Sequence, residues 1–479
     1  MNPMLGLGLL LVGLLTAEGL LKPSFPPNNH GIVKQFSAWK SRRVAQELAR
    51  RNTQFGFKLF KKLATNKPSK NIFFSPLSIS TAFSMLCLGA QDSTQAEIKQ
   101  GFNFRDMSEK DLHEGFHTLI PRLNQGNQDL SLGLENALFV DQKVQLEPKF
   151  QKNVKKMYNA DTIPADFHNL ENARQQINDY VSQKTQGMID DLINSIAPGT
   201  VMLLINCIFF RARWQQEFDP KETKEEDFLM DGNKTAKVPM MSHGGMYEVG
   251  RDDELACTVL EMPYQGNITA TFILPDEGKM KTVEKALKTD TLARWKTVIT
   301  RRVADVSMPK FSITGTYDLK KMLSYLGVSK VFEEHGDLTR ISPNHSLKVS
   351  EAVHKATMRM DEKGTEAAAG SGAQTLPMEK PLSVKMNRPF LLVITEKTTS
   401  SLLFLGKITD PTENYLWVPK VDALMADTET EAQGDARFPV AIQGFAQVVF
   451  VPKPLFSPDR LHPASINKVF TGSHTIQTH

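Results

Sequence analysis

Nearly continuous apolar segments recur along the chain and restrict how it can fold. They are residues 71–90 (NIFFSPLSISTAFSMLCLGA), 201–210 (VMLLINCIFF), 268–275 (ITATFILP) and 390–394 (FLLVI). The last three have the length of strands buried on both faces, and the first predicts a strand that turns at Ser75-Pro76 into a buried helix. Helical spacing beginning near Ser41 adds amphipathic helices between the strands. This mixed order predicts an α+β fold with a large central sheet.

The N-terminal residues predict export. A run rich in glycine and leucine, 4–15, precedes Ala17-Glu18-Gly19, which has small residues where a signal peptidase reads. We therefore expect a signal peptide over residues 1–19 and a secreted, extracellular protein; a buried N-terminal helix is the alternative. Residues 20–44 are expected to be irregular, and no other stretch approaches the length of a membrane span.

Other features of the composition agree with a secreted protein that has a large core. Three triplets of the Asn-X-Ser/Thr type are candidate N-glycosylation sites, at Asn233, Asn267 and Asn344. The three cysteines lie in apolar runs and predict buried free thiols, not a disulfide framework. The formal net charge of +4 is too small to indicate a nucleic-acid-binding protein, so a polyanion site would have to be a local patch.

Residues 113–117 read His-Glu-x-x-His, the spacing of zinc peptidases. A capping box at Ser108 and Asp111 places these residues on a helix that we expect to stop near Pro121. No third ligand follows at the spacing that a metzincin requires, because positions 120 and 123 are Ile and Leu. Helical spacing places His113 and His117 at the margin of the helix, at the edge of its apolar face. The alternatives are a zinc site and two solvated helix histidines. No other catalytic motif is present, so no metal, cofactor or enzyme activity is predicted.

The most unusual segment is 362–381 (EKGTEAAAGSGAQTLPMEKP), between two strand-like stretches. A flexible linker is one interpretation. A linker does not explain why every second position is small, a property suited to a strand that slips between two others and buries one face. The small residues at alternate positions are Thr365, Ala367, Ala369, Ser371 and Ala373.

These segments resemble the serpins of the antitrypsin-like clade. The motifs are 71–90 as quoted, IFFRARW at 208–214, SEAVHKATMRMDEKGTEAAA at 350–369 and NRPFLLVITEKTTSSLLFLGKITDPT at 387–412. The resemblance implies a serpin domain over residues 45–412. It also implies about nine helices around three β-sheets, with a large central sheet A and an exposed reactive-centre loop at about 362–381. In the same clade the helix that corresponds to residues 113–117 commonly lacks the second histidine. This weighs against a zinc peptidase.

The resemblance further implies a suicide inhibitor of serine proteases. With Glu362 at the start of the family hinge, the scissile bond is Met378-Glu379 and the residues before it are Leu376 and Pro377. An unbranched apolar Met378 suits a chymotrypsin-like protease or a kallikrein of chymotryptic preference. The hinge implied in this way consists of Glu362, Gly364, Thr365, Glu366, Ala367, Ala368 and Ala369.

Other positions also match family features. A polar cluster where the strands of sheet A part maps onto Ser75, Ser78, Asn206 and His354, and Trp214 matches a tryptophan near the top of that sheet. Satisfied core polar residues are a compatible interpretation. A heparin or glycosaminoglycan site and a merely solvated sheet face are the alternatives for Arg211, Arg213, Lys355 and Arg359.

The family usually ends near residue 412, so the tail at 413–479 is atypical and expected to be poorly ordered. The implied protein is a monomer whose partner is a serine protease, without a bound cofactor. The rival function is a non-inhibitory serpin that acts as a hormone carrier or signalling protein. The hinge composition favours inhibition.

Overall fold

The computed structural model describes residues 29–124, 129–230, 234–364 and 380–413, with side chains from residue 40 onward. All of them fall within the first of two compact units, 1–420; the second, 421–479, lies outside the described residues. The expected α+β fold with a large central sheet is confirmed. The α-helices in the described part are α2 (Asn29–Asn66), α3 (Pro76–Cys87), α4 (Asp92–Gly101), α5 (Glu109–Leu123), α6 (Pro148–Tyr158), α7 (Leu170–Lys184), α8 (Met280–Ala286), α9 (Thr289–Val298) and α10 (Leu319–Ser324).

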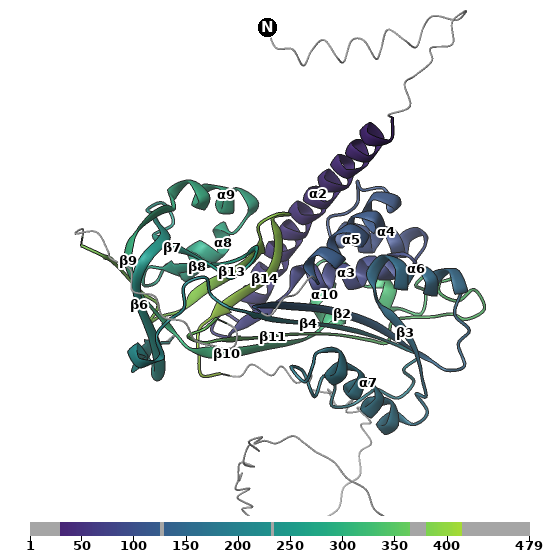
Figure 1. The fold of residues 1–479 in the computed structure, drawn as a ribbon. Helices are drawn as coiled ribbons and strands as arrows, with labels where there is room; N and C mark the ends of the chain where they lie inside the picture. Colours follow the sequence, from purple (N-terminus) through teal and green to yellow (C-terminus); the bar gives the residue numbers. More distant parts are fainter. Residues whose placement is uncertain (1–28, 125–128, 231–233, 365–379, 414–479) are drawn as a thin grey trace, which may run out of the picture. The chain divides into compact units, whose positions relative to one another are not determined.

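A five-stranded sheet forms one layer, and the helices cover both of its faces. Its strands, in spatial order, are β10 (Phe311–Asp318), β11 (Glu351–Met360), β4 (Met202–Ala212), β2 (Leu130–Asp141) and β3 (Asp161–Ala165). Figure 1 shows α7 on one side of this sheet and α3 and α5 on the other. The sheet is the central sheet A that the sequence predicts.

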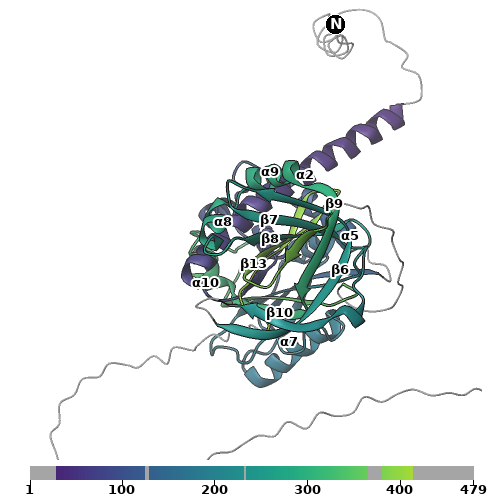
Figure 2. The ribbon, with the colours of Figure 1, turned by 90° about the vertical axis from the view of Figure 1, so that its left-hand side faces the viewer.

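The second sheet has nine strands. They are β1 (Ile72–Phe74), β14 (Ser401–Ile408), β13 (Phe390–Glu396), β8 (Ile268–Pro275), β7 (Cys257–Pro263), β6 (Thr235–Asp252), β9 (Thr300–Pro309) and β12 (Leu382–Lys385), with β5 (Lys224–Leu229) paired to β6. Strands β6, β7, β8 and β13 face the viewer in Figure 2. Three sheets were expected, but the long strand β6 pairs with β5, β7 and β9 and joins the other two into one.

The position of strand β4 between two cores explains why its sequence is apolar at almost every position. Leu204, Ile208 and Phe210 face the larger core, whereas Leu203 and Ile205 face a smaller core under α7. A strand covered on both faces has no solvent side on which polar residues would be favoured. The predicted turn from strand to buried helix at Ser75-Pro76 is also observed, with Ser75 as the N-cap of α3.

Two predicted boundaries differ from the structure. Helix α2 already begins at Asn29, so the expected irregular segment is wrong for residues 29–44. Helix α5 continues through Pro121 to Leu123. The proline removes one amide donor, but the Asn124 amide still donates to the Ile120 carbonyl at 3.0 Å.

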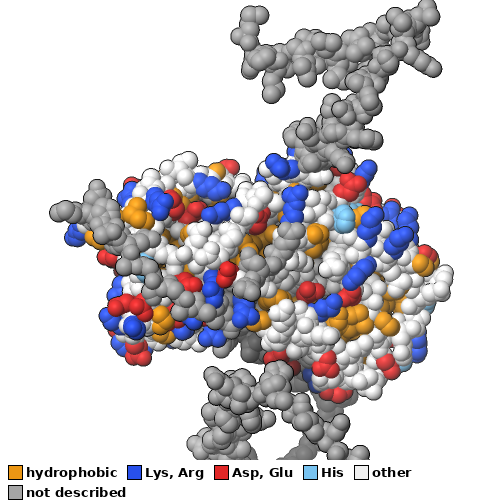
Figure 3. Space-filling model, viewed as in Figure 1, with side chains coloured by type: hydrophobic (Ala, Val, Ile, Leu, Met, Phe, Trp, Pro, Cys, Tyr) orange, Lys and Arg blue, Asp and Glu red, His pale blue; other side chains and the backbone are white. Residues whose placement is uncertain are grey.

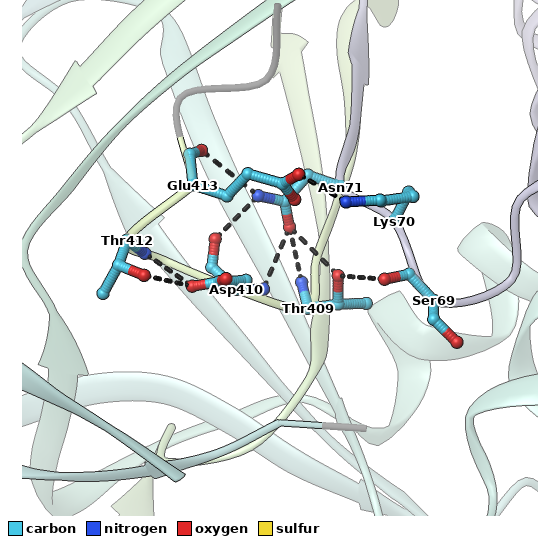
Figure 4. A network of polar contacts seen from close by, with 7 residues as sticks. All are labelled: Ser69, Lys70, Asn71, Thr409, Asp410, Thr412 and Glu413. Atoms are coloured by element: carbon cyan, nitrogen blue, oxygen red, sulfur yellow. Dashed lines mark hydrogen bonds and ion pairs between the residues drawn. The ribbon is translucent and has the colours of Figure 1, made fainter. Parts of the chain in front are cut away.

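Residues 409–413 are fixed to the start of β1 by a network around Asn71 (Figure 4). The Asn71 Nδ2 donates to the Asp410 carbonyl at 2.6 Å, and its Oδ1 accepts from the Thr409 amide at 2.7 Å. Lys70 pairs with Glu413 at 2.6 Å. These contacts hold the last described residues beside the core.

Candidate functional site

The central feature of the site is the boundary between β4 and β11. These two strands are adjacent and parallel, from the pair Glu351 and Leu203 to the pair Met358 and Phe210. Every other pair in the five-stranded sheet except β2 with β3 is antiparallel. Parallel pairing is slightly less stable per residue than antiparallel pairing. A strand inserted here, running against both neighbours, would replace one parallel ladder with two antiparallel ones.

The chain already reverses direction at the end of β11. The Asp361 amide donates to the Gly364 carbonyl at 2.8 Å, and the Gly364 amide donates to the Asp361 carbonyl at 3.1 Å. Glu362 and Lys363 form the tight turn between them. Gly364 also forms an antiparallel bridge with Arg213, beyond the end of β4. This single residue therefore lies between the continuations of β4 and β11, with its chain direction reversed.

Gly364 cannot be replaced without strain in this position. Its φ is 121°, a conformation that L-residues rarely adopt. A Cβ atom there would lie 2.3 Å from the Ala212 carbonyl oxygen and 2.6 Å from the Trp214 amide nitrogen. Both are backbone atoms that cannot rotate away.

Trp214 closes the same end of the boundary. Its backbone amide donates to the Lys363 carbonyl at 2.9 Å, and its Nε1 donates to the Asp361 carbonyl at 3.2 Å. Its ring is fully buried and stacks on Tyr264, with centroids 4.1 Å apart. The structure thus places Trp214 just beyond the end of β4, beside the turn that precedes Gly364.

Glu362 anchors the turn through its side chain. One carboxylate oxygen accepts from Thr223 Oγ1 at 2.9 Å and the other from Lys310 Nζ at 2.8 Å. Burial raises the pKa of Glu362, but the hydrogen bonds from Lys310 and Thr223 outweigh this effect and lower the pKa. Glu362 therefore stays ionised and holds the start of the hinge against Lys310, between β9 and β10, and Thr223, just before β5.

The predicted polar cluster is brought together under the middle of the boundary. His354 and Asn206 are direct partners across β11 and β4, and Asn206 Oδ1 lies 2.6 Å from His354 Nδ1. The Asn206 amide donates to Ser78 Oγ at 2.7 Å, and the Ser75 backbone amide donates to His354 Nε2 at 3.1 Å. The cluster thus connects both strands to the start of α3.

The contacts of His354 define its protonation state. Nε2 accepts a hydrogen bond, so Nδ1 carries the proton that is donated to Asn206. Burial lowers the pKa of His354 to about 3, which keeps the imidazole neutral. Asn136 on β2, which sequence reasoning missed, accepts from Asn206 at 2.6 Å. An Asn in the polar-apolar alternation of β2 gave no indication of this role.

The four candidate heparin residues do not form one exposed patch. Arg211 and Arg359 are exposed, and Arg213 pairs with Asp129 at 3.4 Å. Lys355 is buried, and its Nζ donates to the Asp191 carbonyl at 2.6 Å. Its inclusion in an exposed patch was wrong, because the segment after α7 covers this part of the strand. On the face shown in Figure 3, basic and acidic side chains are interspersed.

The two histidines of residues 113–117 have different environments. His113 is buried, and its Nδ1 lies 2.6 Å from the Tyr158 hydroxyl. Burial lowers its pKa to about 4. His117 is exposed. The expectation that both lie at the margin of the helix was wrong for His113, which packs between α5 and α6, and no group of metal-binding side chains is found among the described residues.

The remaining predicted residues either lie outside the described ranges or are separate from the β4–β11 boundary. The scissile bond Met378-Glu379, the subsites Leu376 and Pro377, the hinge residues from Thr365 onward, and Asn233 are outside the described residues. Asn267 and Asn344 are exposed, as glycosylation would require. Cys87, Cys207 and Cys257 are buried free thiols, as predicted. Within the described ranges no helix is both long and apolar enough to cross a membrane.

Comparisons with known proteins agree with this geometry. A family model described as Serpin (serine protease inhibitor) matches residues 50–411. Human Serpin A12, or vaspin, is 63% identical over 411 residues, covering 86% of this chain and 99% of the relative. Rat Serpin A12 is 54% identical over 411 residues, covering 86% of this chain and 100% of the relative.

Solved structures show the same fold. Human thyroxine-binding globulin complexed with thyroxine aligns with a TM-score of 0.74 at 39% identity, covering 77% of this chain and 100% of that chain. Human glycosylated kallistatin aligns with a TM-score of 0.72 at 38% identity, covering 77% of this chain and 99% of that chain. The resemblance inferred from the motifs is thereby confirmed, and the chain belongs to the serpin family of serine protease inhibitors.

Proposed function

We propose that this chain is a secreted suicide inhibitor of a serine protease. The protease attacks the Met378 carbonyl carbon, the bond to Glu379 breaks, and the enzyme remains as an ester on Met378. The loop then inserts between β4 and β11 with the enzyme attached. The observation that carries the proposal is Gly364, which already pairs with Arg213 and Asp361 in the orientation of an inserted strand.

The register of Gly364 shows where an inserted loop would lie. If the ladder continues, residue 365 lies opposite Ala212 and Met360, and every second residue after it faces the larger core. Those facing partners on β4 are buried, and the matching loop residues are all small. The partners are Ala212, Phe210, Ile208, Asn206 and Leu204. Insertion would therefore not require a large new cavity.

The same register gives Ser371 and Glu366 specific partners. Ser371 falls opposite Asn206 and His354, whose mutual hydrogen bond spans the boundary and must break when the strands part. A hydroxyl there can donate and accept, and so can replace the lost contacts. On the other face, Glu366 falls between the exposed Arg211 and Arg359, where opposite charges attract.

The residues at the scissile bond support a target class. Met378 fits a hydrophobic primary pocket, and Pro377 keeps the approach extended. Many serpins have a small residue directly after the scissile bond, whereas this chain has the charged Glu379. We expect this charge to restrict the range of proteases that the loop inhibits. We propose a chymotrypsin-like protease or a kallikrein of the kallikrein 7 type. Arg211 and Arg359 are proposed to bind heparin or another glycosaminoglycan.

The test is a binding reaction with a panel of such proteases. The purified protein is incubated with each enzyme, and boiled samples are separated on a denaturing gel. We expect a covalent band at the summed mass with a new N-terminus at Glu379. Cleavage without that band would show a substrate and not an inhibitor.

A carrier function is the second candidate. The similar thyroxine-binding globulin was solved with thyroxine bound, and this chain has a pocket of about 560 Å³ between α2, α9 and strands β7, β8 and β13. Its lining includes Arg50, Glu261, Thr269, Thr271 and Trp295. Equilibrium dialysis with labelled thyroxine tests this role. Among the residues that the structure describes, no feature favours an adipokine-like signalling role.

A further inference from the structure

A pocket of about 390 Å³ opens where the ends of α2 and β10 meet the start of β1 and helix α10. We call it the α2–α10 pocket. All four elements contribute to its apolar lining, which consists of Leu63, Ile72, Tyr317, Met322 and Tyr325. The described residues that the proposed loop insertion uses are not part of this lining, so the pocket is a separate feature.

Bonds within the described structure fix the walls of the α2–α10 pocket. The Tyr317 hydroxyl accepts from the Phe73 amide at 3.1 Å, and the Tyr317 ring lies against His354, with ring centroids 6.3 Å apart. Asp318 caps α10 by accepting from the Lys321 amide at 3.2 Å. A preformed pocket binds a segment without first rearranging, which keeps the cost of docking low.

Tyr325 is an exposed aromatic residue at the pocket, directly after α10. Its exposed fraction is 40%, and Leu382 is the only other large hydrophobic residue with such exposure in the described part of the chain. A single exposed aromatic ring needs no explanation. One that lines an apolar pocket is typical of a binding surface, because a ligand can bury the ring and fill the pocket together.

The described part of the chain ends at the edge of this pocket. Asn71, which lines the pocket, donates through Nδ2 to the Asp410 carbonyl at 2.6 Å and to the Glu413 carbonyl at 3.5 Å. The ion pair between Lys70 and Glu413 holds the same end of the chain in place (Figure 4). Because Asn414 is joined to the Glu413 carbonyl, the tail starts beside the pocket lining.

The first residues of the tail have the composition that an apolar pocket accepts. Residues 414–420 read NYLWVPK, with four consecutive apolar residues at 415–418. The first compact unit continues to Lys420, so it includes this stretch. The matching family model ends at residue 411. The stretch is therefore a feature of this chain that lies outside the match.

The volume of the pocket and the spacing of the aromatic residues agree with each other. A cavity of about 150 Å³ is sufficient for one benzene molecule, so the α2–α10 pocket has room for two rings. In an extended segment Tyr415 and Trp417 point to the same side, and Leu416 and Val418 point to the other. At about 3.3 Å per residue, Trp417 can lie up to about 13 Å from Glu413.

We propose that residues 415–418 dock in the α2–α10 pocket of the same chain, with the rings of Tyr415 and Trp417 inserted and Leu416 and Val418 turned away. The tail is thereby tied to α2, β10 and α10. This inference does not depend on the proposed inhibition of a protease. The prediction of a poorly ordered tail then applies only beyond Lys420.

The test is photochemical crosslinking in the full-length protein. Benzoylphenylalanine is placed at position 417, the dilute protein is irradiated, and the crosslinked peptides are identified by mass spectrometry. We expect crosslinks within one chain to the peptides that contain Leu63, Met322 or Tyr325. The same label at position 416 should give a several-fold lower yield at these peptides, because that side chain points away.

A matched pair of surface variants tests whether the pocket itself holds the segment. Tyr325→Ser removes the exposed ring at the pocket and should lower the yield from position 417 several-fold. Leu382→Ser removes a side chain of similar exposure, 38%, on β12 and should leave the yield unchanged. Equal yields in the two variants would overturn the proposal.

Tryptophan fluorescence provides a second readout without a label. The chain has four tryptophans, and the difference between the wild type and Trp417→Phe isolates the signal of Trp417. We expect acrylamide to quench this signal several-fold less than it quenches a free peptide of residues 414–420. Quenching equal to that of the free peptide would overturn docking.

The remaining outcomes of the crosslinking also decide the question. Crosslinks at twice the mass of the chain would mean that a second copy fills the pocket, and crosslinks spread over many surface peptides would mean that the segment has no fixed site. Either result would overturn the proposal. Should Tyr325→Ser fail to fold, the quenching comparison decides, because it leaves the pocket intact.

Discussion

At the scale of single residues, Gly364 has the strictest requirement in the described hinge. Its φ of 121° and the backbone atoms within 2.7 Å of a Cβ position exclude a side chain unless the turn moves. The same turn provides the first pairing of the proposed inserted strand. A substitution at Gly364 should therefore affect both the native state and the start of insertion.

We predict that Gly364→Ala lowers the free energy of unfolding by about 2 kcal/mol or more, through strain and steric overlap. Gly278→Ala is the matched control. It also has a positive φ, 74°, but nothing lies within 4 Å of its Cβ position, so it should cost only about 1 kcal/mol. Urea unfolding measures both, and an equal loss in the two variants would contradict the steric argument.

Two buried histidines predict acid sensitivity. The pKa is lowered by burial from 6.5 to about 3 in His354 and from 6.5 to about 4 in His113. Between pH 6.5 and pH 4 the unfolded chain binds more protons, so stability falls as the pH falls. Each histidine contributes up to about 1.4 kcal/mol per pH unit in this window.

The variant His113→Gln should therefore lose about 2 kcal/mol less than the wild type when the pH is lowered from about 7.5 to about 5. His117→Gln, four positions along the same helix but exposed, should show the wild-type loss. Urea unfolding at the two pH values provides the measurement. An identical pH dependence in all three proteins would mean that His113 is accessible to protons in the native state.

These residues also show the limit of sequence reasoning at this scale. Helical spacing placed His113 at the edge of the apolar face, but it could not show that Tyr158 of another helix would cover it. Strand alternation placed Lys355 on the same face as Arg211 and Arg359. It could not show that the segment between α7 and β4, residues 185–201, covers only the end of that face that contains Lys355. Burial by a distant segment depends on tertiary packing, which local patterns do not contain.

At the scale of elements, the boundary between β4 and β11 determines the proposed chemistry. The apolar runs predicted β4, β8 and β13, and the motif at 350–369 predicted β11 followed by the hinge. The parallel pairing of β4 with β11 could not be derived from periodicity, because the strands lie far apart in sequence. The resemblance to the serpins implied that Asn206 and His354 meet where the strands of sheet A part, but the parallel direction of the pairing comes from the structure. The sequence did not predict that two of the three expected sheets are joined into one. They are joined because the single long strand β6 forms one ladder with β7 and another with β9.

The register predicts opposite outcomes for neighbouring hinge positions. Thr365→Arg would place a charge in the larger core on insertion, at a cost of several kcal/mol, and should turn the inhibitor into a substrate. Glu366→Arg would place the same side chain on the exposed face beside Arg211 and Arg359. That costs no more than about 1 kcal/mol and should leave inhibition largely intact.

The number of inhibitor molecules consumed per protease molecule measures this difference on gels. We expect a large rise for Thr365→Arg and a change of a few-fold at most for Glu366→Arg. Unchanged inhibition by Thr365→Arg would contradict insertion itself. Equal losses in both variants would contradict the register and leave insertion possible in another alignment.

At the scale of the whole molecule, basic and acidic side chains are interspersed on the face shown in Figure 3, so we expect the proposed polyanion binding to depend on a few residues. Arg211 and Arg359 are exposed, whereas Lys355 is buried. The double variant Arg211→Ala, Arg359→Ala should therefore elute from heparin at lower salt than the wild type. Lys355→Met should elute with the wild type. Elution of the double variant at the wild-type salt concentration would remove this site.

The central claim is that the loop becomes a strand of the five-stranded sheet. Its most direct test is the unfolding temperature of the protein before and after a protease cuts the loop at Met378-Glu379. About ten new residue pairs with net hydrogen-bond contributions near 1 kcal/mol each predict a rise of about 10 °C or more after cleavage. An unfolding temperature that stays the same or falls after cleavage would show that the loop does not insert.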